Sequence, residues 1–366
     1  MRILIVITRG DSIGGAQTHV LSIAKGLKAN GDQVLVAFGG KEGVFSSLLK
    51  AEGINYALLK HLKRPVRPVD DFRAVYELCK LIKSYKPNLV ALHSSKAGIL
   101  GRIAGAFTKV PTVVTIHGWS FTDGISNLKA IFYKSIEKAL ARLADKLIVV
   151  SDYDLKLGLD NGISHRNAFV RIYNGIYVDD QFEIERKTKK DKVEIIMVAR
   201  FDNQKDHSTL IKACKDIENI QVRLLGDGPN MEAMVALVKS LYVEDKFIFE
   251  GYQSNVGESL RRADIFVLIS NWEGFPISTL EAMNYGLPVV VSDVGGASEA
   301  VKDGISGFLV QRGDVEALRE RILMLVENPV LRQDMGRHSR QFLQDNFTQI
   351  KMFEETYQVY REIAKL

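Results

Sequence analysis

Short apolar runs alternate with longer amphipathic segments along most of the chain. A short run of this kind is typical of a buried parallel strand, and a longer segment is typical of a helix that covers a sheet. In the first half, the pattern predicts strands at 3–7, 33–38, 88–93, 111–116, 146–150 and near 168–172. It predicts helices near 15–29, 70–84, 97–107 and 127–144. Such alternation indicates an α/β protein with parallel sheets.

The pattern starts again after a polar, basic stretch. Asn174-Gly175 is followed by the charged run 183–192, which is the best linker candidate in the chain. Further strands are predicted at 193–199, 221–225, 246–250, 265–269, 288–292 and 307–310, and the last helices at 314–327, 331–346 and 349–365. We therefore predict two doubly wound, Rossmann-like domains (1–175 and 193–348) that are joined by the linker 176–192 and face a central cleft.

Composition narrows the class of protein. With 366 residues, 46% hydrophobic and 25% charged, the chain is long enough for two globular domains. Its 49 basic and 44 acidic residues give a net charge of +5, which suits a phosphate-bearing substrate or an anionic membrane surface; without a binding motif, we expect no nucleic acid partner. The 2 cysteines lie in helical patterns and predict neither a disulfide framework nor a zinc site.

No targeting or membrane segment is expected. The run Met1–Ile7 is too short for a signal sequence and is interpreted as a first strand. No stretch approaches the ~18 apolar residues of a membrane span. We therefore predict a cytoplasmic protein, with a possible peripheral contact with the inner leaflet of a bacterial plasma membrane.

Two glutamates flank the start of a helix beyond the strand predicted at 265–269. Glu273 follows the strand, and Pro276 is well placed to open the helix that carries Glu281. Ligands of open α/β sheets bind at this edge, where a helix N-terminus also offers free N–H groups. Because carboxylate oxygens accept hydrogen bonds from neighbouring hydroxyls, the arrangement suits a sugar nucleotide. The alternative is that Glu281 supports the helix dipole and Glu273 is solvated.

Cations are predicted at the same sheet edge. Arg200 and Lys205 follow the strand predicted at 193–199. Arginine can grip a phosphate with two hydrogen bonds, and lysine supplies a point charge, so the pair could hold a diphosphate and stabilise it as it leaves. Two solvated loop cations are the alternative interpretation.

Gly14 and Gly15 lie between the first strand and the first helix. Without a Cβ, they would let a phosphate or sugar approach the helix N-terminus. The segment does not match G-x-G-x-x-G, and the chain lacks G-x-x-x-x-G-K-[ST]. Nicotinamide dehydrogenases and P-loop nucleotidases therefore lose their main sequence support.

Four side chains of the first half are candidates for contacts with the reacting sugar or the acceptor. His117 ends a buried strand and could donate to a sugar hydroxyl, although a lone histidine is more often structural. Lys96 follows the strand 88–93. Arg64 and Arg67 belong to a basic, Pro-rich loop that could bind the acceptor or weakly dock on anionic lipid, unless it is an ordinary solvated loop.

Nothing in the sequence predicts a metal site. Asp152 and Asp154 spell D-x-D, but Ser151 with Asp154 is better interpreted as a helix cap. No other His, Asp or Cys residues are grouped at metal-ligand spacing. We expect a site that needs no metal ion and no other cofactor.

In combination, these motifs resemble the retaining glycosyltransferases of family 4, which have the GT-B architecture. The most specific part is Glu273-x7-Glu281, followed in order by Ala282-Met283, Leu287-Pro-Val289 and Gly295-Gly296. The other matching motifs are Gly14-Gly15-Ala16, His117, Arg200 with Lys205, and Gly226-Asp-Gly-Pro229. The resemblance covers nearly the whole chain.

The resemblance implies a role for each candidate residue. Glu281 would bind the ribose of a nucleotide sugar, and Glu273 the hydroxyls of the donor sugar. The donor-binding set would comprise Gly14, Gly15, Arg200, Lys205, Glu273, Gly274, Phe275, Pro276 and Glu281. His117 would lie by the transferred sugar, and the terminal helix 349–366 would complete the first domain. Pro276 stands where glycine is frequent in the family, which leaves the donor open.

The segments 93–102 and 115–121 resemble bacterial members that build capsule, exopolysaccharide or O-antigen chains. We therefore predict a hexosyltransferase that uses a nucleoside-diphosphate sugar and a lipid-linked or oligosaccharide acceptor. Two alternatives stay open. One is a sugar-nucleotide epimerase on the same scaffold, and the other is a non-catalytic subunit that binds sugar nucleotides.

Overall fold

The chain folds into two compact units. The computed structural model describes residues 1–122, 124–178, 191–253 and 255–365. One unit comprises Met1–Gly175 together with Gln349–Leu366, and the other comprises Ile176–Thr348. Most of the predicted linker, from 179 to 190, lies outside the described residues.

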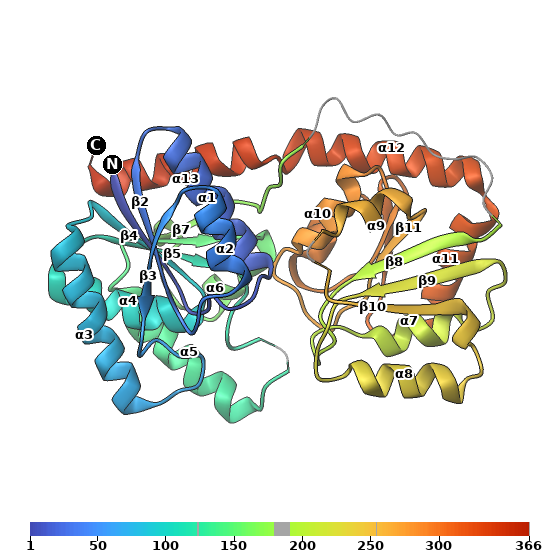
Figure 1. Ribbon diagram of the computed structural model, residues 1–366, viewed down its shortest axis with the longest axis horizontal. Helices are drawn as coiled ribbons and strands as arrows, with labels where there is room; N and C mark the ends of the chain where they lie inside the picture. Colours follow the sequence, from blue (N-terminus) through green and yellow to red (C-terminus); the bar gives the residue numbers. More distant parts are fainter. Residues whose placement is uncertain (123, 179–190, 254, 366) are drawn as a thin grey trace. The chain divides into compact units, whose positions relative to one another are not determined.

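The first unit is built on a parallel sheet of seven strands in the order β3-β2-β1-β4-β5-β6-β7 (Figure 1). Its strands are β1 (Arg2–Ile7), β2 (Gln33–Gly39), β3 (Asn55–Leu59), β4 (Leu89–His93), β5 (Thr112–Ile116), β6 (Lys146–Val149) and β7 (Phe169–Arg171). Its helices are α1 (Gly15–Ala29), α2 (Val44–Ala51), α3 (Pro68–Tyr85), α4 (Ser95–Thr108), α5 (Asn127–Ala141), α6 (Asp152–Asp160), the short η1 (Arg166–Ala168) and α13 (Gln349–Ala364).

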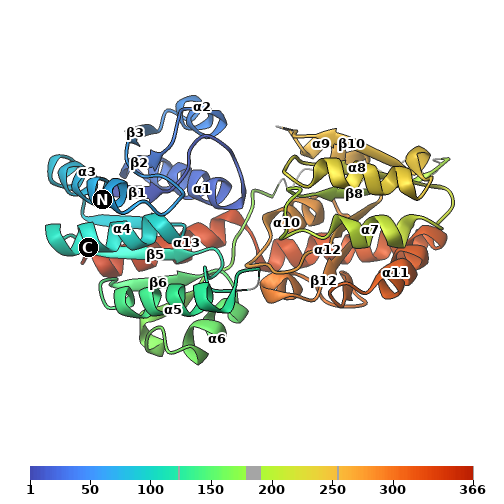
Figure 2. The same cartoon turned by 90° about the horizontal axis from the view of Figure 1, so that it is seen from below.

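Both faces of this sheet are buried, as the continuous apolar strands predict. Alternate side chains of β1 enter two separate cores: Ile5 packs with α1, α2 and α13, whereas Val6 packs with α3 and α4. Helix α13 seals the first core with Met352 and Tyr360, which are 2% and 0% exposed. On the other face, α3, α4 and α5 lie side by side (Figure 2).

The second unit has a six-stranded parallel sheet in the order β10-β9-β8-β11-β12-β13. Its strands are β8 (Val193–Val198), β9 (Ile220–Leu225), β10 (Phe247–Gly251), β11 (Ile265–Leu268), β12 (Val289–Ser292) and β13 (Gly307–Val310). Its helices are α7 (His207–Cys214), α8 (Met231–Ser240), η2 (Glu244–Lys246), α9 (Gly257–Arg262), α10 (Ile277–Asn284), η3 (Gly295–Ala300), α11 (Val315–Glu327) and α12 (Pro329–Asn346). The predicted α/β class with two Rossmann-like sheets is confirmed.

The sequence pattern missed two elements of the first unit, α2 and β3, and predicted only the N-cap of a third, α6. Strand β3 lies at the edge of the sheet and is partly exposed, with Leu58 47% exposed. It therefore lacks the continuous apolar run of a buried strand. Ser151 does cap α6, because its Oγ accepts a hydrogen bond from the Asp154 N–H at 3.0 Å. Within the described residues, no helix combines the length and the apolar composition that crossing a bilayer requires.

Candidate functional site

A buried ion pair lies at the C-terminal edge of the second unit's sheet. Lys205, beyond β8, donates a hydrogen bond from Nζ to Oε1 of Glu273, beyond β11. The two side chains are only 13% and 6% exposed. Glu273 also accepts hydrogen bonds from Ser270 Oγ at 2.6 Å and from Gln204 Nε2 at 3.2 Å. Such a carboxylate is held in one orientation by donors from two different loops.

Two glycines contact the main chain of Glu273. Gly295 has a φ of +56°, and a Cβ there would lie 2.0 Å from the carbonyl oxygen of Glu273. The N–H of Gly296 donates to that carbonyl oxygen at 3.3 Å. Only glycine combines this left-handed backbone with so close an approach. The motif Gly295-Gly296 therefore has a packing role behind Glu273.

Helix α10 begins directly after the glutamate loop. Pro276 is its N-cap residue, without a side-chain cap hydrogen bond. Phe275 is buried and packs its ring 5.1 Å from that of Phe347, while Gly274 is half-buried. The loop is thus anchored by an aromatic contact, and the first N–H groups of α10 lie beside it.

Glu281, in α10, is electrostatically unlike Glu273. Burial raises the pKa of Glu281 to about 7. A carboxyl group with this pKa changes charge near neutral pH, so a ligand whose hydroxyls favour the carboxylate would draw a proton off it.

Arg200 is the most solvent-exposed of the four charged residues predicted at this edge, which also include Lys205, Glu273 and Glu281. Its side chain is 56% exposed, and its nearest recorded partner is Asp202, at 3.9 Å between Nε and Oδ2. Among the described residues, the ion pairs and hydrogen bonds join Lys205 to Glu273 but do not join Arg200 or Glu281 to either. Arg200 therefore keeps a solvated guanidinium at the end of β8, available to an anion.

In the first unit, Gly14 and Gly15 form the start of α1. Gly14 is the N-cap residue, with extended backbone and no side-chain cap, and both glycines are exposed. The terminal N–H groups of α1 are therefore open to solvent at the C-terminal edge of this sheet, where an anion would be favoured.

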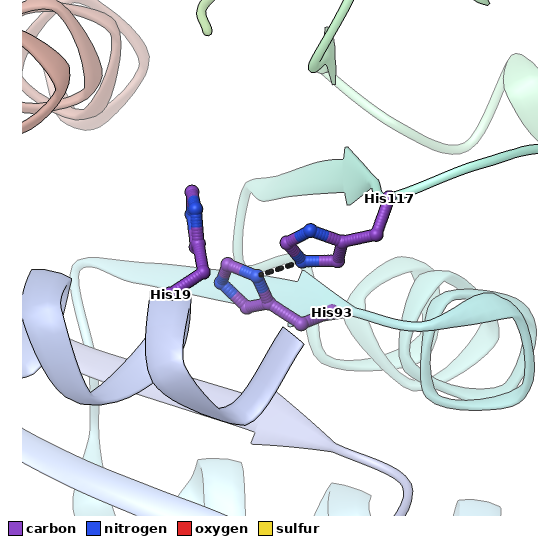
Figure 3. Close-up of side chains that lie close together, drawn as sticks. All are labelled: His19, His93 and His117. Atoms are coloured by element: carbon purple, nitrogen blue, oxygen red, sulfur yellow. Dashed lines mark hydrogen bonds between the residues drawn. The ribbon is translucent and has the colours of Figure 1, made fainter. Parts of the chain in front are cut away.

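His117 belongs to a cluster of three histidines that we call the histidine cluster: His19, His93 and His117. His93, at the end of β4, and His117, just beyond β5, share a hydrogen bond of 3.2 Å between Nδ1 and Nε2 (Figure 3). His19, in α1, packs its ring edge against that of His117 at a centroid distance of 4.8 Å. His19 also shares a 2.9 Å hydrogen bond between its Nδ1 and Asn174 Oδ1.

All three imidazoles are held in the neutral form. Burial lowers the pKa of His19 to about 4, against the raising effect of Asn174. The pKa of His93 and that of His117 are well below their usual value, mainly because the rings are buried and to a smaller extent because other imidazoles lie beside them. At neutral pH the histidine cluster therefore carries lone pairs and N–H groups but no net charge.

The residue after His93 has an unusual backbone. Ser94 has a φ of +73°, which is rare for a residue with a side chain. Its Oγ lies 2.6 Å from Thr8 Oγ1, which in turn accepts the N–H of Ala97 at 3.1 Å. These bonds tie β1, β4 and the start of α4 together, and backbone strain of this kind is typical of functional sites.

The predicted acceptor residues lie on one loop and the helix beside it. Lys96 is only 12% exposed at its side chain, and it binds Asp71 at 2.6 Å and the carbonyl of Pro65. Arg64 and Arg67 are exposed, and Arg67 lies 3.8 Å from Asp70. Lys96 thus holds the loop in place, and the arginines are its solvent-facing charges.

Sequence reasoning did not single out four residues that complete these sites: His19, His93, Ser270 and Gln204. His93 could have been found as a histidine at the end of a central strand, and His19 as the residue one turn beyond Gly15. Ser270 and Gln204 carry no such signal, since polar residues are common in the loops after strands.

The family model described as Glycosyltransferase Family 4 matches residues 13–180, and the model described as Glycosyl transferases group 1 matches residues 179–342. The UDP-Gal:alpha-D-GlcNAc-diphosphoundecaprenol alpha-1,3-galactosyltransferase of Escherichia coli is 28% identical over 320 residues, 83% of this chain and 82% of that protein. The capsular polysaccharide biosynthesis glycosyltransferase CapM of Staphylococcus aureus is 25% identical over 356 residues, 92% of both chains.

A solved structure shows the same fold. Anabaena HepE, crystallised with UDP and glucose, superposes with a TM-score of 0.86 at 21% identity, covering 99% of this chain and 100% of that one. This likeness confirms the predicted GT-B architecture. The two family models follow one another along the sequence, and the relatives match along most of their length. The chain belongs to glycosyltransferase family 4, and it is a glycosyltransferase.

Proposed function

We propose that this enzyme transfers a hexosyl group from a UDP-sugar to a hydroxyl of a lipid-linked or oligosaccharide acceptor in the synthesis of a cell-surface polysaccharide. The relatives favour this: one uses UDP-Gal and a diphosphoundecaprenol-linked sugar, and another serves capsular polysaccharide biosynthesis. The HepE structure with UDP and glucose supports uridine as the base.

The buried Lys205–Glu273 pair is the observation that carries the proposal. In the free enzyme, Lys205 satisfies the Glu273 carboxylate. When donor binds, the remaining N–H groups of Lys205 would meet the diphosphate, and the remaining lone pairs of Glu273 would accept the donor sugar hydroxyls. Arg200 would bind the diphosphate from its solvated position, and Glu281 would accept hydrogen bonds from the ribose.

In the proposed reaction, the bond between the anomeric carbon and the diphosphate oxygen breaks, and a bond from that carbon to the acceptor oxygen forms. The acceptor proton passes to the departing phosphate. This same-face route retains the configuration and needs no covalent nucleophile on the protein. Arg200, Lys205 and the N-terminus of α10 would stabilise the charge that develops on the leaving diphosphate. We therefore expect transfer without a metal ion.

Two further contributions come from the first unit. We expect the N–H of Gly15, beside Gly14, to assist with the diphosphate, and His117 to hydrogen-bond the transferred sugar as a neutral imidazole. Because the pKa of His117 is far below neutral, its role would be to donate or accept a hydrogen bond without carrying charge.

The basic loop is proposed to guide the acceptor. Arg64 and Arg67 would attract its diphosphate, and Lys96 would hold the loop in shape. Val66 and Phe72, beside these arginines, are 66% and 78% exposed. Apolar side chains flanked by cations suit a weak contact with an anionic bilayer, where a lipid-linked acceptor would be presented.

The test is a transfer assay with purified enzyme, radiolabelled UDP-glucose, UDP-galactose and their N-acetylamino forms, and a polyprenyl-diphosphate-linked sugar. We expect one donor to label the lipid-linked acceptor, with retained anomeric configuration and undiminished rate in EDTA. Isomerised donor in the absence of acceptor would instead reveal an epimerase. Tight UDP binding without turnover on any acceptor would contradict the proposal and favour a non-catalytic subunit.

A further inference from the structure

The histidine cluster brings three potential metal ligands to one point. Each imidazole offers a nitrogen that lies within 4.8 Å of the other two. The three residues come from α1, β4 and the end of β5, at the place where the strand order of the sheet reverses between β1 and β4. Figure 3 shows the rings gathered at this edge. Within the described ranges, no other group of His, Cys, Asp and Glu reaches this convergence.

The orientation of His19 matches that of a metal ligand. Its Nδ1 is hydrogen-bonded to the amide oxygen of Asn174 at 2.9 Å, so Nδ1 carries the proton and Nε2 carries the lone pair. That Nε2 is buried and has no hydrogen-bond partner among the described residues. Histidines that bind metals usually donate their other N–H to an oxygen in this way, which fixes the tautomer and the ring.

The spacing of the other two rings also fits. His93 Nδ1 and His117 Nε2 are 3.2 Å apart. Two nitrogens bound at ~2.0–2.1 Å to one tetrahedral ion lie roughly 3.3–3.4 Å apart, so this pair is already at ligand spacing. Both nitrogens must offer a lone pair to the ion, so the proton of their hydrogen bond moves to the other nitrogen of the ring that carries it. The widest separation in the cluster has to shrink by about 1–1.5 Å for an ideal site, which small side-chain rotations allow.

The ligand set selects the kind of metal. Three imidazoles suit Zn²⁺, Co²⁺, Ni²⁺ or Cu²⁺, whereas Mg²⁺ and Ca²⁺ require oxygen ligands. Only His117 is partly exposed, so an ion would enter on its side and keep its fourth position there.

We infer that His19, His93 and His117 form a three-imidazole binding site for one divalent transition-metal ion, of which Zn²⁺ is the physiological candidate. The proposed transfer chemistry needs no metal ion, but it shares His117 with this site. Occupancy has a consequence that rests on the proposed function: an ion bound to His117 takes the nitrogen that the donor sugar needs. Zn²⁺ therefore inhibits transfer.

Binding is tested without any turnover assay, on the full-length, untagged chain titrated with Co²⁺. We expect about one equivalent to bind and to give the intense visible absorption of a four-coordinate ion. Only the weak spectrum of six-coordinate cobalt, or substoichiometric binding, would overturn the inference. A sulfur-to-cobalt charge-transfer band would place the ion on Cys79 or Cys214 and would overturn it equally.

Variants locate the ion. His19→Gln and His93→Gln should each weaken Co²⁺ and Zn²⁺ binding at least about tenfold, as the loss of one of three ligands requires. His338→Gln, which replaces an exposed histidine of α12, is the matched control and should bind as the wild type does. Circular dichroism and melting curves identify variants that fail to fold. If folded His19→Gln and His93→Gln both retain wild-type affinity, the site is wrong.

The functional consequence is read separately, by Zn²⁺ titration of the transfer assay. We expect inhibition with the same concentration dependence as binding, reversed by EDTA, and weaker in His19→Gln than in His338→Gln. Zn²⁺ that binds to the histidine cluster without slowing transfer would support the metal site and contradict the proposed role of His117. The two proposals can therefore fail independently.

Discussion

The two sheets place different chemistry at equivalent positions. In each unit the strand order reverses beside the first strand, between β1 and β4 in one and between β8 and β11 in the other. At this edge of the first unit, His19 of α1, His93 at the end of β4 and His117 just beyond β5 form the histidine cluster. In the second unit, Lys205 and Glu273, which follow β8 and β11, form the ion pair. One edge is neutral, and the other holds full charges.

The contrast follows from the hydrogen-bond donors around each group. The buried Glu273 accepts hydrogen bonds from three side chains, Lys205, Ser270 and Gln204. His93 and His117 share a hydrogen bond with each other, and burial lowers the pKa of both so that they stay neutral. One doubly wound scaffold can therefore present either a charge-stabilising edge or a neutral, polar edge, depending on which partners its loops supply.

The largest effect should come from breaking the charged edge. Lys205→Met leaves Glu273 without its cation. It also removes the positive charge that would stabilise the leaving diphosphate, so we expect the transfer rate to fall about 10²–10³-fold. Stability should drop by about 2–4 kcal/mol because a buried carboxylate loses its partner. Transfer rate and urea unfolding measure the two losses.

Two variants serve as controls. Lys239→Met, at an exposed lysine of α8, should change neither quantity. Adding Glu273→Gln to Lys205→Met should restore most of the stability, since the unpaired charge is gone, but none of the activity. A double variant as unstable as Lys205→Met alone would show that the pair is not what stabilises this edge.

The packing behind Glu273 should matter next. Gly295→Ala introduces a Cβ at 2.0 Å from the Glu273 carbonyl oxygen, so it should displace the loop and slow transfer roughly 10–100-fold. Gly304→Ala has a comparable positive φ, +74°, but nothing within 4 Å of its Cβ. Gly304→Ala therefore reports the backbone strain alone, about 1–2 kcal/mol.

Equal losses of stability in Gly295→Ala and Gly304→Ala would contradict the close approach. Melting temperature and transfer rate, measured on both variants, decide the matter.

The sequence predicted the central strands and the residues at their ends, because buried parallel strands have continuous apolar runs that propensity and periodicity both mark. It missed β3, since an edge strand such as Asn55–Leu59 is partly exposed and lacks that pattern. Helix α2, only Val44–Ala51, is too short for periodicity to be distinctive.

For the candidate sites, the sequence identified which residues follow which strands but not how their side chains pair. Lys205 and Glu273 were both predicted, but the bond between them depends on tertiary contact. Lys96 was predicted to meet the acceptor, and its contacts with Asp71 and the carbonyl of Pro65 have no signal in the sequence. His19 escaped notice because a histidine within a helix gives no sign of neighbours on other strands.

A pH titration should sharpen the contrast between the two glutamates. Burial raises the pKa of Glu281 to about 7, so protonation is favoured in the folded protein below that pH. If the ribose requires the carboxylate, affinity for a UDP-sugar should rise about tenfold from about pH 6 to pH 8, with proton release on binding. Calorimetry in two buffers measures both the affinity and the proton release.

Glu281→Gln should flatten this pH dependence. It should also stabilise the free protein at about pH 8, where the buried carboxylate is ionised at a cost, and have little effect at about pH 5, where Glu281 is protonated. An unchanged pH profile in Glu281→Gln would remove Glu281 from the ribose site.

The smallest effect is expected at the surface of the first unit. Arg64→Ala with Arg67→Ala should lower binding to vesicles rich in phosphatidylglycerol only a few-fold, because Asp70, 3.8 Å from Arg67, already offsets part of the charge. Neutral phosphatidylcholine vesicles should bind neither form. Cosedimentation measures this, and equal binding by the double variant and the wild type would exclude the loop as a docking surface.

We propose that glycosyl transfer depends on the charged pair at the second unit's sheet edge. Glu273→Gln tests it most directly, because the amide keeps the size of the side chain and an oxygen for Lys205 while removing the carboxylate. We predict a folded protein that still binds UDP but transfers sugar from its UDP-sugar to a polyprenyl-diphosphate-linked acceptor at least about 100-fold more slowly. Transfer at the wild-type rate by Glu273→Gln would contradict the account.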